Sequence, residues 1–298
     1  MAPSETVTIE NDAIRVVALP WFGARVVSLV DKASGRDWLA PGGISENTGE
    51  DAVYSVDEAV GWDECFPTVS RWDASTTPWG RNLRDHGDLW GRPWQITEQT
   101  ATLLQTVFAG AQFRFGRQLS LDSRTLTASY EVENTGNAPL PFLWALHALL
   151  ITRSGEEISL PGRDKLAVTF LSLDGQRIDA STLPWPDSGT VLPFPIGQIQ
   201  PVESRFMAKL FAPYQTAASV GGAGGWLDFA WEGIDHLGIW LAYGAWPRPG
   251  SIHHVALEPT TDPLDHLGQV LDRGRTLPIA PGETRNWRVT MNVRGPVY

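Results

Sequence analysis

The sequence predicts an all-β fold in which antiparallel strands form a sandwich or a barrel. Apolar and polar residues alternate with a period of two through much of the chain, whereas long helical patterns are hard to find. Turn signals follow one another at close spacing, and 29 glycines and 22 prolines are spread over the 298 residues. Many short strands joined by tight turns are typical of these architectures.

The first predicted element is a hairpin in which residues 7–9 and 14–16 are joined by a turn at Asn11-Asp12. Another strand is expected over residues 25–30, followed by a turn around Ser34-Gly35.

The clearest alternation runs over residues 111–132, with Arg117 as the one break in its apolar phase. A turn at Asp122-Ser123 divides it into two strands, and Asn134-Thr135-Gly136 ends the second with another turn signal. A last strand is expected behind the turn Pro281-Gly282, where four apolar residues alternate with polar ones: Trp287, Val289, Met291 and Val293.

We found no repeat, low-complexity tract or linker that divides the chain, so residues 1–298 are expected to form a single domain. The proline-rich region from Pro184 to Pro201 is interpreted as a long loop on one large sheet system. A chain of this length buries a large core.

Composition restricts the partners and the location. A formal net charge of −11 argues against binding to nucleic acid or to an anionic membrane. Cys65 is the single cysteine, which excludes an internal disulfide. A signal-peptide pattern and an apolar run of membrane-spanning length are both lacking. We therefore expect a soluble cytoplasmic protein, a monomer or homodimer, with no nucleic-acid or membrane partner.

The segment from Gly61 to Trp94 suggests the ligand class. It gathers five tryptophans, four arginines, several carboxylates and one histidine. A pyranose has apolar C–H patches on its faces and hydroxyls at its edge, which aromatic rings and charged groups respectively bind. The segment predicts a sugar ligand, without distinguishing binding from catalysis.

Three residues are candidates for acid–base chemistry. His147 lies in the most apolar stretch of the chain, residues 141–150, where a lone histidine is more often a hydrogen-bonded core residue than a catalyst. Burial and a neighbouring carboxylate together can nevertheless tune its imidazole for acid–base work. His86 precedes Gly87, which permits close approach of a ligand to the backbone. Glu258 ends an apparent strand that Pro259 stops, so it is either a rim residue or a base in a cleft.

A metal site and a cysteine nucleophile are two alternatives to an acid–base site. His86, His147, His253 and Glu258 are the residue types of a cupin metal site. Short histidine spacings of the required kind are lacking, and His253 and His254 would point to opposite faces of a strand. Neither a metal nor a cofactor is expected, and Cys65 has no evident activating base.

Several motifs together resemble the aldose 1-epimerase (galactose mutarotase-like) superfamily over nearly the whole chain. The matching segments are Ile9 to Leu39, Gly61 to Thr68, Asp85 to Trp90, Glu133 to Gly136 with Pro141 to His147, Val255 to Pro259, and Pro281 to Thr284. Their order and spacing carry the resemblance more strongly than any one motif.

This resemblance implies an antiparallel, galactose mutarotase-like β-supersandwich with a cleft on one concave sheet. It also implies a cofactor-independent isomerase, an aldose 1-epimerase (mutarotase) that interconverts the α and β anomers of a free monosaccharide. Glu258 would be the general base on the C1 hydroxyl, and His147 the general acid on the ring oxygen. His86 would hydrogen-bond near both oxygens. Positioned acid–base groups suffice for such a reaction.

Departures from the family pattern around His147 and His86 indicate a divergent branch and leave the sugar open. Asp63, Arg92 and Trp62 are expected to contact substrate hydroxyls. Arg92 and Arg84 are also suited to reading a phosphate or sulfonate, so an anionic sugar is one candidate. A surface or inter-strand salt bridge is an equally weighted alternative to a substrate contact for Arg92.

Two other function classes compete. A non-catalytic carbohydrate-binding or sensor protein is compatible with the same fold. A polysaccharide lyase or glycosidase is the third reading, although a lyase would need a basic groove, and a glycosidase a carboxylate pair at a set separation.

Overall fold

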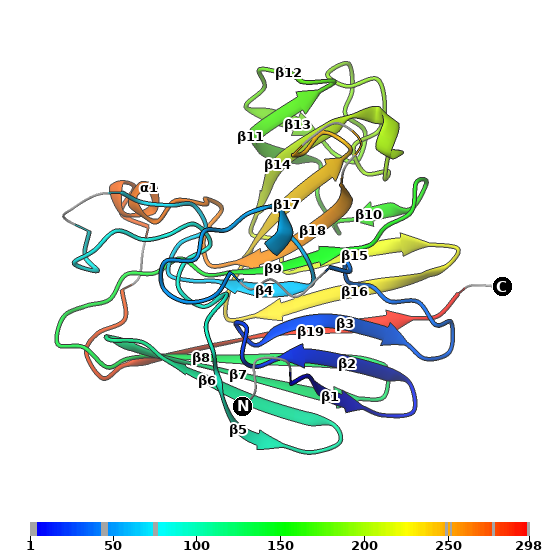
Figure 1. The fold of residues 1–298 in the computed structure, drawn as a ribbon. Helices are drawn as coiled ribbons and strands as arrows, with labels where there is room; N and C mark the ends of the chain where they lie inside the picture. The colour runs from blue at the N-terminus through cyan, green and yellow to red at the C-terminus, as the bar shows by residue number, and fades with distance from the viewer. Residues whose placement is uncertain are drawn as a thin grey trace.

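The computed structural model describes residues 5–42, 47–73, 77–247, 250, 252–275 and 278–296. In this part of the chain two antiparallel sheets pack face to face, one of eleven strands and one of eight (Figure 1). The expected all-β, antiparallel sandwich is confirmed. No helix among the described residues is long and apolar enough to span a membrane.

The larger sheet carries the N-terminal hairpin at one edge and the central strands of the chain at the other. Its order is β1 (Val7–Glu10), β2 (Ile14–Leu19), β3 (Arg25–Asp31), β4 (Trp62–Cys65), β9 (Ala145–Leu150), β18 (His253–Thr260), β17 (His236–Tyr243), β14 (Phe206–Pro213), β11 (Lys165–Leu173) and β12 (Gln176–Arg177), with β13 (Thr182–Pro184) also paired to β11.

The smaller sheet closes the other side of the core. Its order is β10 (Glu157–Ser159), β15 (Ala217–Gly222), β16 (Gly225–Glu232), β19 (Thr284–Arg294), β8 (Thr125–Asn134), β7 (Phe113–Asp122), β6 (Leu103–Ala109) and β5 (Gln95–Gln99). Among the described residues the helical elements are α1 (Leu267–Asp272) and two 3-10 turns, Val56–Glu58 and Val202–Ser204.

The strands predicted from alternation are present. The first hairpin pairs β1 with β2, and the long pattern at 111–132 becomes β7 and β8, joined at Ser123 with a φ of 52°. The loop expected from Pro184 to Pro201 follows β13 and returns to the sheet at β14. One face of each of these strands lies on the shared core, so every second residue is buried. This is why the alternation of apolar and polar residues predicted them.

A buried ion pair explains why Arg117 interrupts an apolar phase. Its Nη1 lies 2.9 Å from Oε1 of Glu64, and both side chains are fully buried between the sheets. The same carboxylate accepts hydrogen bonds from the indole N–H of Trp62 and of Trp144, each at 3.0 Å. Arg117 therefore faces the core with its neighbours in phase, and its charge is compensated from the opposite sheet.

The alternation in β4 decides which of its residues can reach the functional face. Trp62 and Glu64 point into the core between the sheets, so Asp63 and Cys65 point to the other face of the larger sheet. On that face Asp63 is paired in register with His147 of β9. The sheet thus presents a line of side chains across neighbouring strands, and the candidate site is built on it.

Candidate active site

A cavity of about 360 Å³ lies on the face of the larger sheet that is turned away from the core. This volume falls in the range typical of small-molecule sites, about 300–1,000 Å³. Its lining contains three histidines (His86, His147 and His254), four aromatic rings (Tyr54, Phe170, Trp240 and Trp246) and four charged groups (Asp85, Lys209, Glu258 and Asp265). All three residues expected to be catalytic therefore meet at this cavity.

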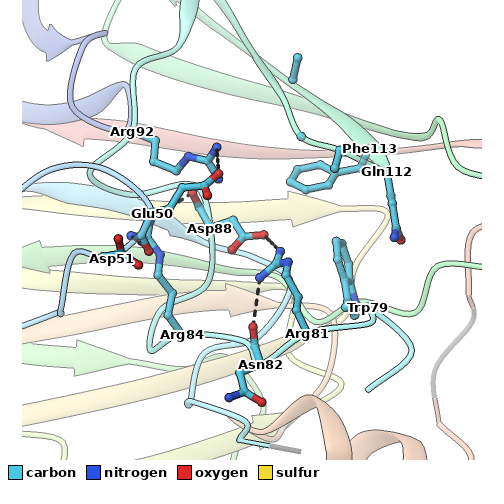
Figure 2. A pocket seen from close by; sticks show the side chains of 13 residues that line it. Glu50, Asp51, Trp79, Arg81, Asn82, Arg84, Asp88, Arg92, Gln112 and Phe113 are labelled. Carbon is cyan, nitrogen blue, oxygen red and sulfur yellow. Dashed lines mark hydrogen bonds and ion pairs between the residues drawn. The ribbon is translucent and has the colours of Figure 1, made fainter. Parts of the chain in front are cut away.

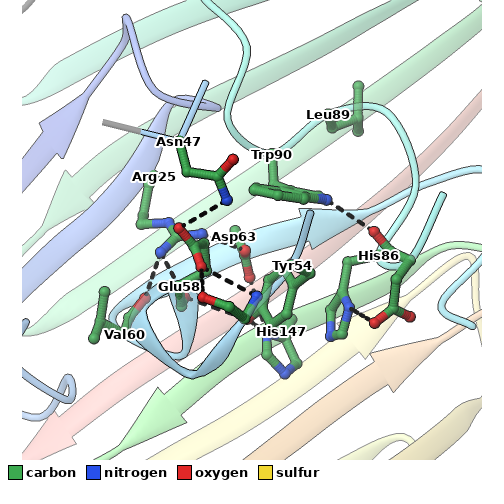
Figure 3. A network of polar contacts seen from close by, with 12 residues as sticks. Arg25, Asn47, Tyr54, Glu58, Val60, Asp63, His86, Leu89, Trp90 and His147 are labelled. Carbon is green, nitrogen blue, oxygen red and sulfur yellow. Dashed lines mark hydrogen bonds and ion pairs between the residues drawn. The ribbon is translucent and has the colours of Figure 1, made fainter. Parts of the chain in front are cut away.

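His147 is held from below by a buried carboxylate. Its Nδ1 lies 2.9 Å from Oδ1 of Asp63, whose Oδ2 lies 2.7 Å from the Arg25 guanidinium (Figure 3). Burial raises the pKa of Asp63, but the Arg25 charge and the bond to His147 outweigh it and lower that pKa. An ionised Asp63 accepts, so Nδ1 of His147 carries a proton and Nε2 is left for the cavity.

Glu258 lies beside His147 on the next strand. The register of β18 with β9 pairs Ala256 with Leu149 and Thr260 with Ala145, which places Glu258 opposite His147. Side chains opposite each other in such a ladder have Cβ atoms about 4.5–5.5 Å apart. A carboxylate and an imidazole are therefore adjacent at the cavity floor, where Glu258 is only 2% exposed.

Glu258 is also part of an ion group that the sequence did not predict. Lys209 of β14 contacts its Oε2 and lies 3.2 Å from Oδ1 of Asp265. Burial disfavours the ammonium, but the two carboxylates outweigh this and raise the pKa of Lys209 well above its ordinary value. Lys209 is therefore a permanent cation at the cavity wall.

His86 approaches from a loop rather than from a strand. Its φ is 59°, and its ring stacks on Tyr54 with centroids 3.6 Å apart, while the His147 ring lies edge-on at 4.9 Å. A Cβ at Gly87 would lie 2.0 Å from the Phe66 carbonyl oxygen. The glycine thus permits close approach of the chain to itself, and this contact turns His86 toward the cavity.

Asp85 supports His86 from the same loop. Its Oδ2 lies 3.5 Å from Nδ1 of His86. Burial raises the pKa of Asp85, but its interactions with His86 and His147 outweigh this and lower the pKa. The two histidines are thus each accompanied by a carboxylate, Asp85 at the rim and Asp63 beneath the floor.

The far wall of the cavity is aromatic. Trp240 and Trp246 lie edge to face with centroids 6.2 Å apart, and the Trp240 indole N–H donates to Nε2 of His254 at 3.2 Å. Phe170 completes this wall from β11. Aromatic rings opposite acid–base groups provide the apolar surface that a sugar face needs.

His254 gives the protein a pH-dependent stability. Burial, followed by the neighbouring His147 and His253, lowers its pKa from 6.5 to about 3. Between pH 3 and pH 6.5, His254 binds a proton in the unfolded chain but not in the folded chain. The free energy of unfolding therefore falls as the pH drops from 6.5 toward 3, by up to about 1.4 kcal/mol per pH unit. Urea unfolding at pH 7 and pH 5 should show a smaller loss for His254→Gln, which keeps an acceptor for Trp240. Equal losses in both proteins would contradict this assignment.

Trp62 has no free surface for a ligand. Its indole is fully buried in the core and donates to Glu64, because it points to the opposite face of β4 from Asp63. Four of the five tryptophans between Gly61 and Trp94 are at most 4% exposed: Trp62, Trp79, Trp90 and Trp94. The segment contributes His86 and Asp85 to the cavity, while its tryptophans pack the protein.

Asp63 also differs from its expected position, since it is 1% exposed and lies behind His147 rather than in the cavity. Its contact is with the imidazole, not with a substrate hydroxyl. A carboxylate there fixes the tautomer and orientation of the histidine.

Arg92 and Arg84 line a different cavity, of about 440 Å³, which shares no lining residue with the first (Figure 2). Arg92 pairs with Glu50 at 2.9 Å, in agreement with the salt-bridge alternative. Arg84 donates to five backbone carbonyls, including those of Gly49 and Gly87. Neither guanidinium is brought to the His147–Glu258 pair.

Five residues of the cavity lining were not predicted from the sequence: Tyr54, Lys209, Trp240, His254 and Asp265. The one available signal was a lone lysine in the apolar run of residues 206–213. Such a charge in a buried strand requires a partner, but the sequence does not say which one. Within the described ranges, no group of three or more His, Cys, Asp or Glu residues is arranged to hold a metal ion.

Solved structures of similar shape define the class of fold. A galactose mutarotase-like protein from Lactobacillus casei superposes with a TM-score of 0.65 at 13% identity, over 97% of this chain and 100% of its own. A galactose mutarotase related enzyme from Lactobacillus acidophilus gives 0.67 at 15% identity, covering 98% of each chain. A galactose mutarotase-like protein from Clostridium acetobutylicum gives 0.67 at 14%, over 97% and 95%.

No protein-family model matches the chain, and no curated protein matches its sequence. The predicted likeness to galactose mutarotase-like proteins is confirmed at the level of the fold. At these identities the likeness shows a galactose mutarotase-like β-sandwich and leaves the reaction to the residues of the cavity.

Proposed function

We propose that the protein is an aldose 1-epimerase that interconverts the α and β anomers of a free monosaccharide. The observation that carries this proposal is the placement of Glu258 opposite His147 at the floor of one cavity, with Asp63 holding the imidazole. An adjacent base and acid are what ring opening requires, because one proton leaves O1 while another reaches the ring oxygen.

Each proton that Glu258 or His147 transfers is returned within one catalytic cycle. Glu258 takes the proton of the C1 hydroxyl while His147, protonated on both ring nitrogens, delivers its Nε2 proton to the ring oxygen, so the C1–O5 bond breaks and an aldehyde forms. After rotation about C1–C2, the C5 hydroxyl attacks the other face of the carbonyl. His147 recovers its proton from that hydroxyl, and Glu258 returns its proton to O1. No redox change occurs, and positioned groups contribute about 10²–10⁴-fold each.

The charges of the cavity support an uncharged sugar rather than an anionic one. Among its described lining residues, one ammonium (Lys209) stands against three carboxylates, those of Asp85, Glu258 and Asp265. Lys209 is already paired with two of them. A phosphate or carboxylate on the sugar would add a like charge, and the described lining residues offer no unpaired Lys or Arg to receive it.

Polarimetry on freshly dissolved α-anomers tests both parts of the proposal. We expect the protein to accelerate relaxation of at least one aldose among glucose, galactose, mannose and xylose, in proportion to its concentration. Glucose 6-phosphate should relax at its buffer rate. Acceleration of the phosphate alone would contradict the charge argument, and acceleration of none would contradict the activity.

A sugar-binding protein without catalysis is the second candidate. The observation that favours it is the contact between Lys209 and Glu258, because a carboxylate held in a buried ion pair can shape the cavity without taking part in proton transfer. Calorimetry distinguishes the two functions. Sugar binding without any acceleration of anomer exchange would select the binding protein.

A further inference from the structure

We propose that Lys209 is a positioning residue that holds the carboxylate of Glu258 in its working orientation. The inference rests on the proposed function of the cavity. Lys209 engages Oε2 of Glu258, whereas Oε1 has no hydrogen bond within the described part of the chain. One oxygen is therefore fixed, and the other remains for the C1 hydroxyl of a sugar.

The charge state of Lys209 excludes two other roles. Its ammonium lies between Glu258 and Asp265 and its side chain is 10% exposed, so the pair of carboxylates keeps it protonated. A protonated lysine is neither a base nor a nucleophile toward an aldehyde. What remains is orientation of the groups that it contacts.

The sheet leaves an open path for this contact. Lys209 on β14 is paired with Trp240 of β17, whereas Glu258 on β18 is paired with Gly238. The lysine must therefore reach diagonally across β17. A Cβ at Gly238 would lie 2.9 Å from Oε2 of Glu258 and 3.2 Å from Cε1 of Phe211. The missing side chain at Gly238 makes room for the ion pair.

The same lysine connects the base to the loop that carries His86. Its second partner, Asp265, accepts at its main-chain oxygen from the N–H groups of Val69 and Ser70, at 3.0 and 2.7 Å. The carbonyl of Val69 in turn accepts from the N–H of His86 at 2.7 Å. Lys209 thus sets Glu258 relative to the histidine loop, and its loss should disturb geometry at the reacting centre.

The test compares Lys209→Met with Lys209→Arg by anomer-exchange kinetics on the aldose that the wild type accelerates most. We expect Lys209→Met to lower kcat about 100-fold, the order of loss caused by a misplacement of about 1 Å, with KM close to wild type. Lys209→Arg should recover most of that loss because it restores the cation. Lys165→Met, at an exposed lysine of β11, is the matched control and should be unchanged.

A folding defect is separated from a positioning defect by the double variant Lys209→Met/Asp265→Asn, which also removes one of the two opposed carboxylates. It should melt nearer the wild type than Lys209→Met does, yet remain slow. Recovery of kcat in the double variant would overturn the proposal, as would a Lys209→Met kcat within about threefold of wild type. A rise in KM alone would show a substrate contact instead.

A crystal structure of the double variant gives an answer that does not depend on activity. If the wild type accelerates no sugar, the proposed function fails, but the orientation of Glu258 can still be compared. Departure of its carboxylate from the side of His147 supports positioning by Lys209. An unchanged carboxylate overturns it.

Discussion

Glu258→Gln is expected to lower kcat for anomer exchange by about 10²–10⁴-fold while the affinity for sugar stays close to wild type. Glutamine has the shape of glutamate and keeps an oxygen that accepts from Lys209, so the ion group loses a charge but not its packing. What disappears is the group that takes the proton from O1. Exchange kinetics at saturating sugar, together with calorimetry, measure the two quantities separately.

The matched control is Glu98→Gln, at an exposed position of β5 on the smaller sheet. It makes the same chemical change far from the cavity and should leave kcat unaltered. A Glu258→Gln protein that binds sugar and retains more than about a tenth of the wild-type kcat would remove Glu258 from the role of base.

Asp63→Asn should reduce both the rate and the stability. The amide places no negative charge beside the imidazolium and no longer requires Nδ1 of His147 to be the donor, so less of the histidine is held as the working acid, and kcat drops by about 10²–10⁴-fold. Arg25, which is 1% exposed, also loses its counter-charge. Breaking a buried pair from one side costs about 3–5 kcal/mol, to be read from urea unfolding.

The double variant Arg25→Met/Asp63→Asn separates these effects. Removing the guanidinium as well relieves the uncompensated charge, so part of the lost stability should return while kcat stays low. If the rate returned together with the stability, Asp63 would act through folding alone and not through the orientation of His147.

The parts of the fold that were predicted are those that depend on neighbouring residues. The hairpin at 7–16 and the paired strands β7 and β8 follow from period-two alternation, because each has one face on the core. Arg117 looked like an error in that pattern and is instead half of a buried pair with Glu64. The sequence around Arg117 contains no signal of a partner on a distant strand.

The candidate site shows the same limit. His147, Glu258 and His86 were candidates from their sequence surroundings and received their roles through a family resemblance, and the structure gathers them at one cavity. Lys209 lies on a strand far from Glu258 in sequence and meets it only through the order of β14, β17 and β18. Sheet order is a tertiary property that local pattern does not contain.

The tryptophan-rich segment is instructive because composition suggested a ligand surface there. Composition does not say which face of a strand a residue occupies. Trp62 and Asp63 are neighbours in sequence, yet one packs the core beside Glu64 and the other supports His147. The aromatic wall of the cavity comes from Trp240 and Trp246, outside that segment.

Exchange NMR between the α and β anomeric protons of a free aldose tests the central claim most directly. With wild-type protein, we expect magnetisation transfer between the two anomers of at least one uncharged sugar, in proportion to protein concentration, with loss of transfer in Glu258→Gln. Transfer at the buffer rate for every sugar that calorimetry shows to bind would contradict it.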